Sequence, residues 1–133
     1  MTTYGLGAMY NGTEDKMQDF IERRSAYVGG SETDAPFFHV LLRRINVGDF
    51  VFLKSYPPNR GLLIKAIGIV TEPQFIAGAD DLGTRIGVDW RYVPKEPISI
   101  GPLNDKADFM RRGSIYEELN PQLLRRITAL LLA

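Results

Sequence analysis

The sequence predicts an α+β fold, in which a small, strongly curved, mostly antiparallel sheet or β-barrel carries helices on its flanks. Several strand-like segments follow one another through the middle of the chain with short connections, as in antiparallel sheets. Amphipathic helical patterns precede and follow them, which excludes the regular alternation of a doubly wound parallel sheet. At 133 residues the chain has the length of one domain with an adequate core, so we expect a single domain over residues 1–133.

The first part of the chain alternates strands and helices. Residues 4–10 have the character of a short strand, and Asn11-Gly12 is a turn signal. Thr13 is the expected N-cap of an amphipathic helix over residues 14–24, because acidic residues follow it and arginines end the segment. A strand within residues 25–31 then runs into a glycine loop.

The middle of the chain holds the strongest strand signals. Residues 35–44 are expected to form a helix with one buried stripe, and the β-formers of residues 50–54 predict a strand. Pro57-Pro58 cannot continue a ladder, so a loop separates this strand from the next, over residues 62–71. Residues 85–93 alternate apolar and polar side chains, as in a half-buried strand. The expected helical stripe is Phe37, Phe38, Leu41 and Leu42.

The last part returns to helices after one edge strand, residues 98–100. Asn104 or Asp105 is expected to start a short helix that ends before Gly113. Asn120-Pro121 combines an N-cap with a proline at the first helical position, so a final helix begins there. Its apolar stripe is Leu123, Ile127, Leu130 and Leu131.

Composition excludes several classes of protein. Hydrophobic residues make up 44% and charged residues 24% of the chain, an ordinary globular mixture. The absence of cysteine excludes a disulfide scaffold and a thiol nucleophile, and a single histidine excludes a His-rich metal centre. The chain has no apolar run of the roughly 18 residues that a membrane span needs, no secretory signal and no dinucleotide-binding glycine motif. We therefore expect a cytoplasmic protein with no membrane segment, metal or cofactor.

The charges are balanced, with 16 basic and 16 acidic residues, which excludes a uniformly basic coat but not a local basic groove. Six arginines lie in pairs at the ends of expected helices, where the helix dipole accounts for them. Cations on strands and loops are better candidates for binding phosphate, although an ordinary solvated face explains them equally well. The pairs are Arg23-Arg24, Arg43-Arg44 and Arg111-Arg112, and the phosphate-binding candidates are Lys54, Arg60, Arg85 and Arg91.

Aromatic residues outside the buried stripes suggest a site for a planar ligand. Tyr10, Tyr27 and Tyr56 lie beside glycines, prolines or loop junctions, where a ring can face a pocket mouth and stack on a nucleobase. Trp90 has two interpretations. Its place in the alternation of the strand 85–93 favours the core, and a pocket wall is the alternative.

Three segments resemble the PUA-like superfamily, and most of all its EVE-like domains and the related N-terminal domains of modification-dependent restriction enzymes. The first is a Gly-Asp strand entry, Ile45-Asn46-Val47-Gly48-Asp49-Phe50-Val51-Phe52-Leu53. The second is the strand Leu63-Ile64-Lys65-Ala66-Ile67-Gly68-Ile69-Val70-Thr71-Glu72-Pro73. The third is Gly87-Val88-Asp89-Trp90-Arg91-Tyr92-Val93, followed by Glu96-Pro97-Ile98. The resemblance spans residues 4–131 through the order and spacing of these motifs.

This resemblance implies a PUA-like β-barrel with flanking helices that binds nucleic acid and is a reader rather than an enzyme. Such domains hold a flipped-out, modified base of DNA or RNA in a pocket near the barrel mouth. Where related domains often carry a tryptophan, this chain has Gly30-Ser31. With the candidates above, the expected base-binding residues are Tyr10, Asn11, Tyr27, Gly29, Gly30, Ser31, Tyr56 and Trp90. The expected phosphate-binding residues are Lys54, Ser55, Arg60, Arg85 and Arg91.

Two other functions stay open. Related PUA-like proteins of the ASCH type include hydrolases and nucleases, and in that case Lys54 with Thr71 or Glu72 would serve as base or nucleophile partner. No catalytic triad is evident, and His39 is expected to be structural. The third function is a small regulator that binds a protein partner. The leucine-rich segment Leu123–Leu132 would then form a homodimer face, although a core helix is favoured.

Overall fold

The computed structural model describes residues 1–29, 33, 36–73, 82–103 and 105–133. The strands are β1 (Thr3–Gly7), β2 (Met9–Tyr10), β3 (Glu14–Asp15), β4 (Ser25–Val28), β5 (Phe50–Ser55), β6 (Leu62–Glu72), β7 (Thr84–Tyr92), β8 (Ile98–Gly101) and β9 (Ile115–Glu117). The helices are α1 (Met17–Glu22), α2 (Pro36–Arg43) and α3 (Pro121–Leu132), with one 3₁₀ turn, η1 (Met110–Arg112).

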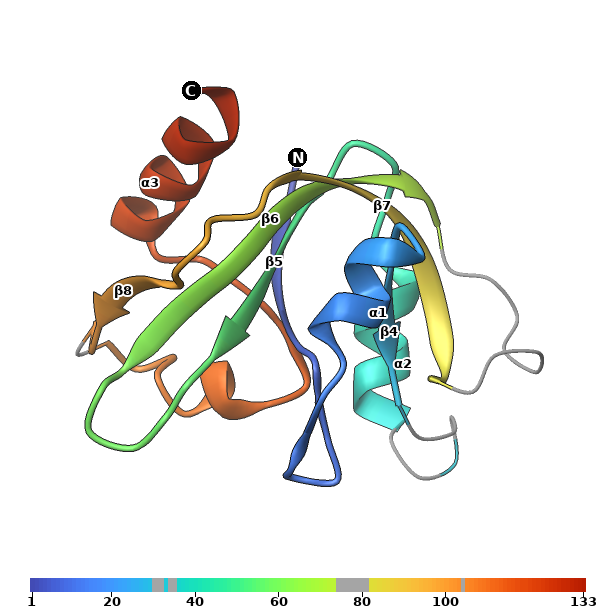
Figure 1. Ribbon diagram of the computed structural model, residues 1–133, viewed down its shortest axis with the longest axis horizontal. Helices are drawn as coiled ribbons and strands as arrows, with labels where there is room; N and C mark the ends of the chain where they lie inside the picture. Colours follow the sequence, from blue (N-terminus) through green and yellow to red (C-terminus); the bar gives the residue numbers. More distant parts are fainter. Residues whose placement is uncertain (30–32, 34–35, 74–81, 104) are drawn as a thin grey trace.

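A curled seven-stranded sheet forms the body of the protein (Figure 1), in the order β4-β7-β6-β5-β1-β9 with β8 paired to β6. All neighbouring strands are antiparallel except β1 and β5, which are parallel. The α+β class is thus confirmed, and the sheet is mixed. The end strands β4 and β9 do not pair with each other in the described chain, so the structure is a half-barrel rather than the closed barrel of the expectation.

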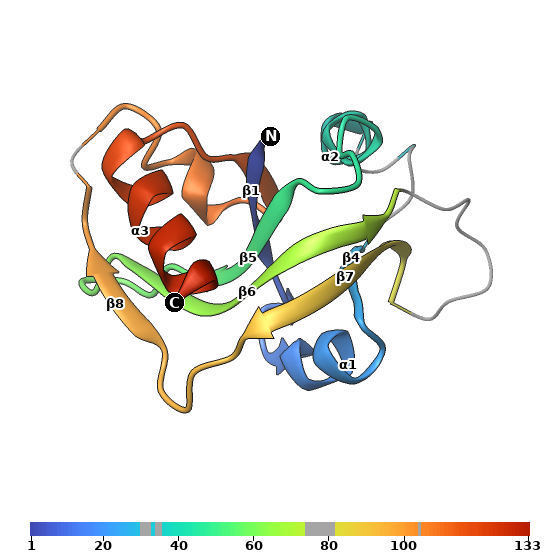
Figure 2. The same ribbon diagram turned by 90° about the horizontal axis from the view of Figure 1, so that it is seen from above.

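The long strand β6 gives the sheet its curl, which Figure 2 shows from above. Register shifts interrupt its pairing with β5 after Leu53 and its pairing with β7 after Ile67 and Val70. Each such irregularity bends a strand and increases its twist. The bends allow one sheet to face two separate apolar layers.

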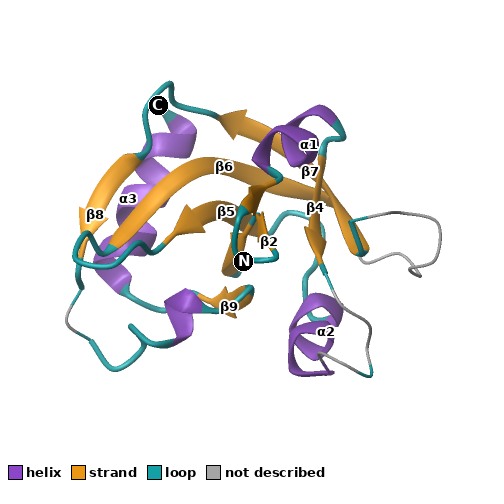
Figure 3. Cartoon of the chain, turned by 60° about the horizontal axis from the view of Figure 1, so that its bottom comes forward, coloured by secondary structure: helices purple, strands orange, loops and turns teal. Residues whose placement is uncertain are grey.

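The two apolar layers lie on opposite faces of the sheet, with α1 and α2 at one end and α3 at the other (Figure 3). We call the layer beside α1 and α2 the first and the layer beside α3 the second. Successive side chains of β5 alternate between them, so that Val51 and Leu53 lie in the first layer and Phe50 and Phe52 lie in the second. The helices contribute Phe20, Leu41 and Leu42 to the first layer and Leu123, Ile127 and Leu131 to the second. None of the helices among the described residues combines the length and apolarity that a membrane crossing requires.

The first helix is shorter than the sequence predicts. Asn11 and Gly12 have φ angles of 55° and 73°, the left-handed conformation of a tight hairpin turn, as expected. The hairpin continues into β3, however, so Thr13 does not cap a helix and α1 begins only at Met17. Asp15 Oδ1 accepts the Met17 N–H at 2.9 Å and stabilises the helix start instead.

The second helix forms where expected but buries a different face. Phe37 is 58% exposed, so the predicted stripe is wrong at this position. His39 is buried, together with the expected Leu41 and Leu42. The helix packs against β4 and β9, and in a segment that is mostly apolar only this tertiary contact selects the inward face.

Strand β9 has no counterpart among the expected elements. It pairs with β1, so that Tyr116 lies opposite Gly5. A Cβ atom at Gly5 would overlap the Tyr116 ring, and glycine therefore makes room for the tyrosine. The expected short helix before Gly113 is reduced to the turn η1.

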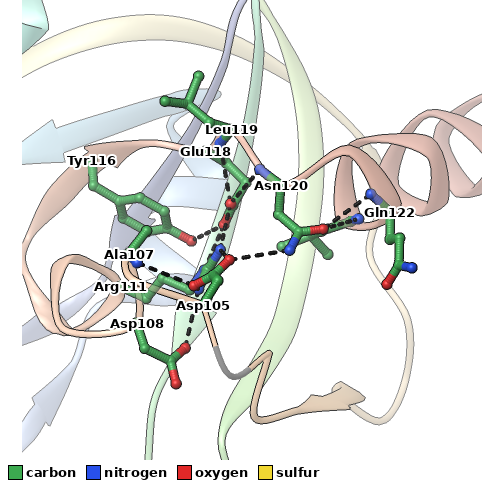
Figure 4. Close-up of polar contacts among 10 residues, drawn as sticks. Asp105, Ala107, Asp108, Arg111, Tyr116, Glu118, Leu119, Asn120 and Gln122 are labelled. Atoms are coloured by element: carbon green, nitrogen blue, oxygen red, sulfur yellow. Dashed lines mark hydrogen bonds and ion pairs between the residues drawn. The ribbon is translucent and has the colours of Figure 1, made fainter.

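Arg111 lies at the centre of a buried ion cluster (Figure 4) and is fully buried. Its Nε and Nη2 donate to the Glu118 carboxylate at 2.8 and 2.7 Å, and Nη1 and Nη2 donate to Asp105 at 2.6 and 2.9 Å. Nη1 also donates to Asp108 at 3.0 Å, so the guanidinium uses its complete donor fork. The interpretation of Arg111 as a helix-end cation is therefore wrong.

The cluster connects the chain before η1 with β9 and α3. The Tyr116 hydroxyl donates to Glu118 at 2.9 Å, and Asn120 Nδ2 donates to Asp105 at 3.1 Å. Asn120 Oδ1 accepts the N–H groups of Gln122 and Leu123, which confirms the predicted N-cap. The Arg111 guanidinium holds the pKa of the Asp105 carboxyl well below its usual range. Burial and the Glu118 charge raise the pKa of the Tyr116 phenol.

Replacement of Arg111 should therefore be far more destabilising than replacement of its neighbour. Arg111→Met leaves the buried Glu118 carboxylate without a cation and should lower the free energy of unfolding by about 3–5 kcal/mol. Arg112→Met removes an exposed arginine and should cost less than about 1 kcal/mol. Urea denaturation of both variants measures the difference, and equal costs would contradict the role assigned to the cluster.

Candidate functional site

Two hollows meet at the end of β1 and form the candidate site. The smaller one, with a volume of about 230 Å³, is lined by Tyr10, Asn11, Tyr27, Val28 and Gly29, and we call it the tyrosine cleft. The larger one, of about 720 Å³, is lined by Lys54, Ser55, Tyr56, Lys65, Arg112 and Gly113 among others, and we call it the lysine groove. Gly7, Met9 and Ser114 line both, so the two hollows are adjacent.

The hairpin of β2 and β3 and the end of β4 position the tyrosine cleft. The Tyr10 ring packs over Gly29, where an added Cβ would lie 3.2 Å from its Cε2 atom. The Tyr10 hydroxyl donates to the Leu82 carbonyl oxygen at 2.6 Å, which fixes the ring. Asn11 follows on the hairpin turn and lines the same cleft. A held aromatic ring beside an amide side chain suits a planar polar ligand.

Tyr27 has a different position from the one expected for a stacking ring. It is 1% exposed, and its centroid lies 5.3 Å from that of Phe20 in the first apolar layer. Tyr27 therefore forms the buried back wall of the cleft, and Tyr10 is the partly exposed ring. Gly30 and Ser31 lie outside the described residues.

The lysine groove is positively charged. Lys54, Lys65 and Arg112 line it, and no carboxylate does so among the described residues. Lys65 pairs with Asp15 of β3 at 2.6 Å, and the Arg112 guanidinium lies over the Tyr56 ring, 5.1 Å from its centroid. These residues offer cations and an aromatic face, which suit a phosphate group and a ring.

Lys54 differs from the other two cations because it is buried. Only 6% of its surface is exposed, and its Nζ donates to the Gly113 carbonyl oxygen at 2.5 Å. Burial lowers the pKa of Lys54 from its ordinary value of 10.5 to about 8. The side chain is therefore still mostly charged near neutral pH.

Tyr56 forms the opposite part of the groove, on the loop after β5. Burial and a hydrogen bond with Asp108 raise the pKa of the Tyr56 phenol, so the hydroxyl stays protonated. The ring thus offers a neutral stacking surface under the Arg112 guanidinium.

The other predicted residues do not join this site. Arg85 and Trp90 line a third hollow of about 700 Å³ with Arg23, Arg24 and Glu72, which we call the arginine groove. The Trp90 Nε1 donates to the Ser25 carbonyl oxygen at 3.1 Å, so the indole belongs partly to the core and partly to this groove. Arg91 pairs with Asp89 at 2.8 Å, and Arg60 is exposed on the loop after β5.

The arrangement also bears on the hydrolase interpretation. Thr71 is exposed and Glu72 lines the arginine groove, whereas Lys54 lines the lysine groove. The lysine and the carboxylate that this interpretation needs therefore face different hollows. Sequence reasoning missed Lys65, Arg112 and Ser114 as site residues, because a β-bulge and the unpredicted β9 bring them to the groove.

Comparisons with known proteins support the fold. The crystal structure of protein Atu2648 from Agrobacterium tumefaciens is similar over 97% of this chain and 92% of its own, with 15% identity and a TM-score of 0.58. The NMR structure of Rpa0253 from Rhodopseudomonas palustris is similar over 98% and 93%, with 11% identity and a TM-score of 0.58. The DUF55 domain of human thymocyte nuclear protein 1 is similar over 99% and 100%, with 12% identity and a TM-score of 0.61.

No protein-family model matches the chain, and no curated protein matches its sequence. At identities this low, the structural likenesses show a shared fold and no more. The chain therefore shares its α+β fold with these three structures.

The buried lysine makes the stability of the protein depend on pH in a defined direction. Between about pH 8 and pH 10.5, the unfolded chain keeps the Lys54 proton that the folded chain has lost, so folding stability rises with pH in this window. From near neutral pH to above this window, the free energy of unfolding of the wild type should rise relative to that of Lys54→Met by about 3 kcal/mol. Denaturant titrations of both proteins over this range measure the shift, and a constant difference would contradict it.

Proposed function

We propose that this protein binds DNA or RNA by holding one flipped-out, modified base in the tyrosine cleft while the lysine groove binds the adjacent backbone. The adjacency of the two hollows, which share Gly7, Met9 and Ser114, is the observation that carries this proposal. A nucleotide has a planar ring and an anionic tail, and the site has an aromatic cleft beside a cationic groove.

The tyrosine cleft supplies what a flipped base needs. Flipping costs a few kcal/mol, and stacking on an aromatic ring offsets about 1–3 kcal/mol of this cost. Tyr10 is the stacking ring, Tyr27 closes the back of the cleft, and the Asn11 amide reads a polar edge of the base. Gly29 has no side chain to push against the Tyr10 ring, so the ring can lie close to the backbone there.

The lysine groove supplies the contacts to the backbone. Lys54, Lys65 and Arg112 bind phosphate oxygens, and the Ser55 hydroxyl adds a neutral donor. Tyr56, held under Arg112, offers a stacking surface for a neighbouring base. The preference for a modified base rests on the resemblance to EVE-like domains. Arg60, Arg85, Arg91 and Trp90 have no part in this proposal, because they lie outside both hollows.

Stacking on Tyr10 can be tested with a matched pair of variants. Tyr10→Leu should weaken binding to single-stranded oligonucleotides that carry a modified base by about tenfold, because it removes the ring. Tyr10→Phe keeps the ring and loses only the hydrogen bond to Leu82, so it should retain most of the affinity. Fluorescence anisotropy with methylated and unmethylated oligonucleotides measures both. If Tyr10→Phe weakened binding as much as Tyr10→Leu does, the aromatic ring of Tyr10 would not be what contacts the base.

The backbone contact predicts a salt dependence with a matched control. Arg112→Met should weaken binding several-fold for all sequences and reduce the slope of log affinity against log salt by about 1. Arg91→Met removes an exposed arginine outside the site and should change neither value. Affinity of the wild type that is insensitive to salt would exclude the lysine groove as a phosphate site.

A further inference from the structure

Among the residues that the structure describes, Lys54 is a buried cation without a counter-ion. Its ammonium group has three N–H donors, of which the Gly113 carbonyl oxygen accepts one. Across the described residues, Lys54 forms no ion pair, and burial is the cause of its lowered pKa. Arg111, by contrast, is buried with three carboxylates around it.

Such an arrangement costs folding free energy, because a buried charge without a partner loses its hydration and gains no attraction in return. The ammonium group lies beside Gly7, where an added Cβ would lie 3.6 Å from Lys54 Nζ, and Gly7 and Gly113 both line the lysine groove. The charge therefore lies near the junction with the tyrosine cleft, which Gly7 also lines.

We propose that the ligand itself supplies the missing counter-charge, so that Lys54 selects ligands with an anionic oxygen close to the bound ring. This inference rests on the proposed function and names its ligand class. The anionic oxygen belongs either to the phosphate of the bound nucleotide or to an acidic substituent on its base. Neutral nucleosides are then poor ligands.

The other charged groups around the groove do not provide this selection. Lys65 on β6 is already neutralised by Asp15 of β3, and Arg112 at η1 lies over Tyr56 near Asp108. The exposed Arg112 is a general contact for any polyanion, and the Lys65 charge is already balanced by its carboxylate partner. Lys54, 6% exposed, bonds an anion where little water competes, and charge-assisted hydrogen bonds are strongest there.

Proton uptake on binding distinguishes an anion bound at Lys54 from an anion that is attracted by the other cations of the groove. An anion beside Lys54 favours its charged form and raises its pKa, so binding at a pH slightly above 8 must take up a proton. Affinity should accordingly fall as the pH rises beyond that point. Lys65→Met is the matched control, because it removes a lysine from the same groove without changing the buried one.

The experiment combines calorimetry and NMR at a pH slightly above 8. The probes are inorganic phosphate, the four common nucleosides, their 5′-monophosphates, and 5-carboxymethyluridine as a nucleoside with an acidic base. We expect at least about tenfold tighter binding of monophosphates, or of the carboxylated nucleoside, than of neutral nucleosides. Proton uptake, measured in buffers of different ionisation enthalpy, should persist in Lys65→Met and vanish in Lys54→Met.

The NMR signal of the Lys54 ε-methylene group can be followed in the wild-type protein, so this measurement does not depend on how a variant folds. The midpoint of its pH titration should move to higher pH when an anion is bound. The probe that causes this shift shows whether the anionic oxygen belongs to a phosphate or to a base substituent. Equal binding of nucleosides and monophosphates without proton uptake would overturn the inference and leave the proposed function standing. If inorganic phosphate bound as well as the monophosphates did, so that the base contributed nothing to binding, the proposed function would be contradicted and the anion site at Lys54 would remain. No response to any anion would overturn the inference.

Discussion

The buried guanidinium of Arg111 is the interaction on which the rest of this structure depends. Its bonds to Asp105 and Glu118 tie an irregular segment to the sheet and to the start of α3. That segment contains β9, so the cluster also fixes the strand that pairs with β1. The next residues along the chain, from Arg112 to Ser114, form one wall of the candidate site. A buried ion cluster thus positions one wall of the candidate site without lining the site itself.

Two cations are buried among the described residues, Arg111 and Lys54, and they have opposite surroundings. Arg111 has more carboxylate than it needs for neutrality, and its charges are mutually satisfied within the fold. Within the described part of the chain, Lys54 has a carbonyl oxygen as its partner and no carboxylate, and it lines a groove that opens to solvent. The first arrangement holds structure together, because every donor has a partner. The surroundings of Lys54 leave ammonium N–H donors available, which is expected of a group that binds a ligand.

Much of the fold could be predicted from local patterns. The alternation of residues 85–93, the Asn11-Gly12 turn and the cap at Asn120-Pro121 each occur as expected, because each depends on neighbouring residues only. The inward face of α2 could not be predicted, since the exposed Phe37 and Val40 are as apolar as the buried Leu41 and Leu42, and contact with the sheet decides between them. Strand β9 escaped prediction because a three-residue strand has too short a pattern to recognise.

Some residues of the candidate site could likewise be recognised in the sequence, and others could not. Local chemistry singled out Tyr10 and Lys54, because rings at turn junctions and a lysine at a strand end are visible in the sequence, whereas the family resemblance added Asn11. Only the tertiary structure decided that Arg112 joins them and that Trp90 does not, since the bulges of β6 and the pairing of β9 set which strand ends meet. Short-range propensity determines each element, whereas hydrogen-bond register over long distances along the chain determines which side chains share a cavity.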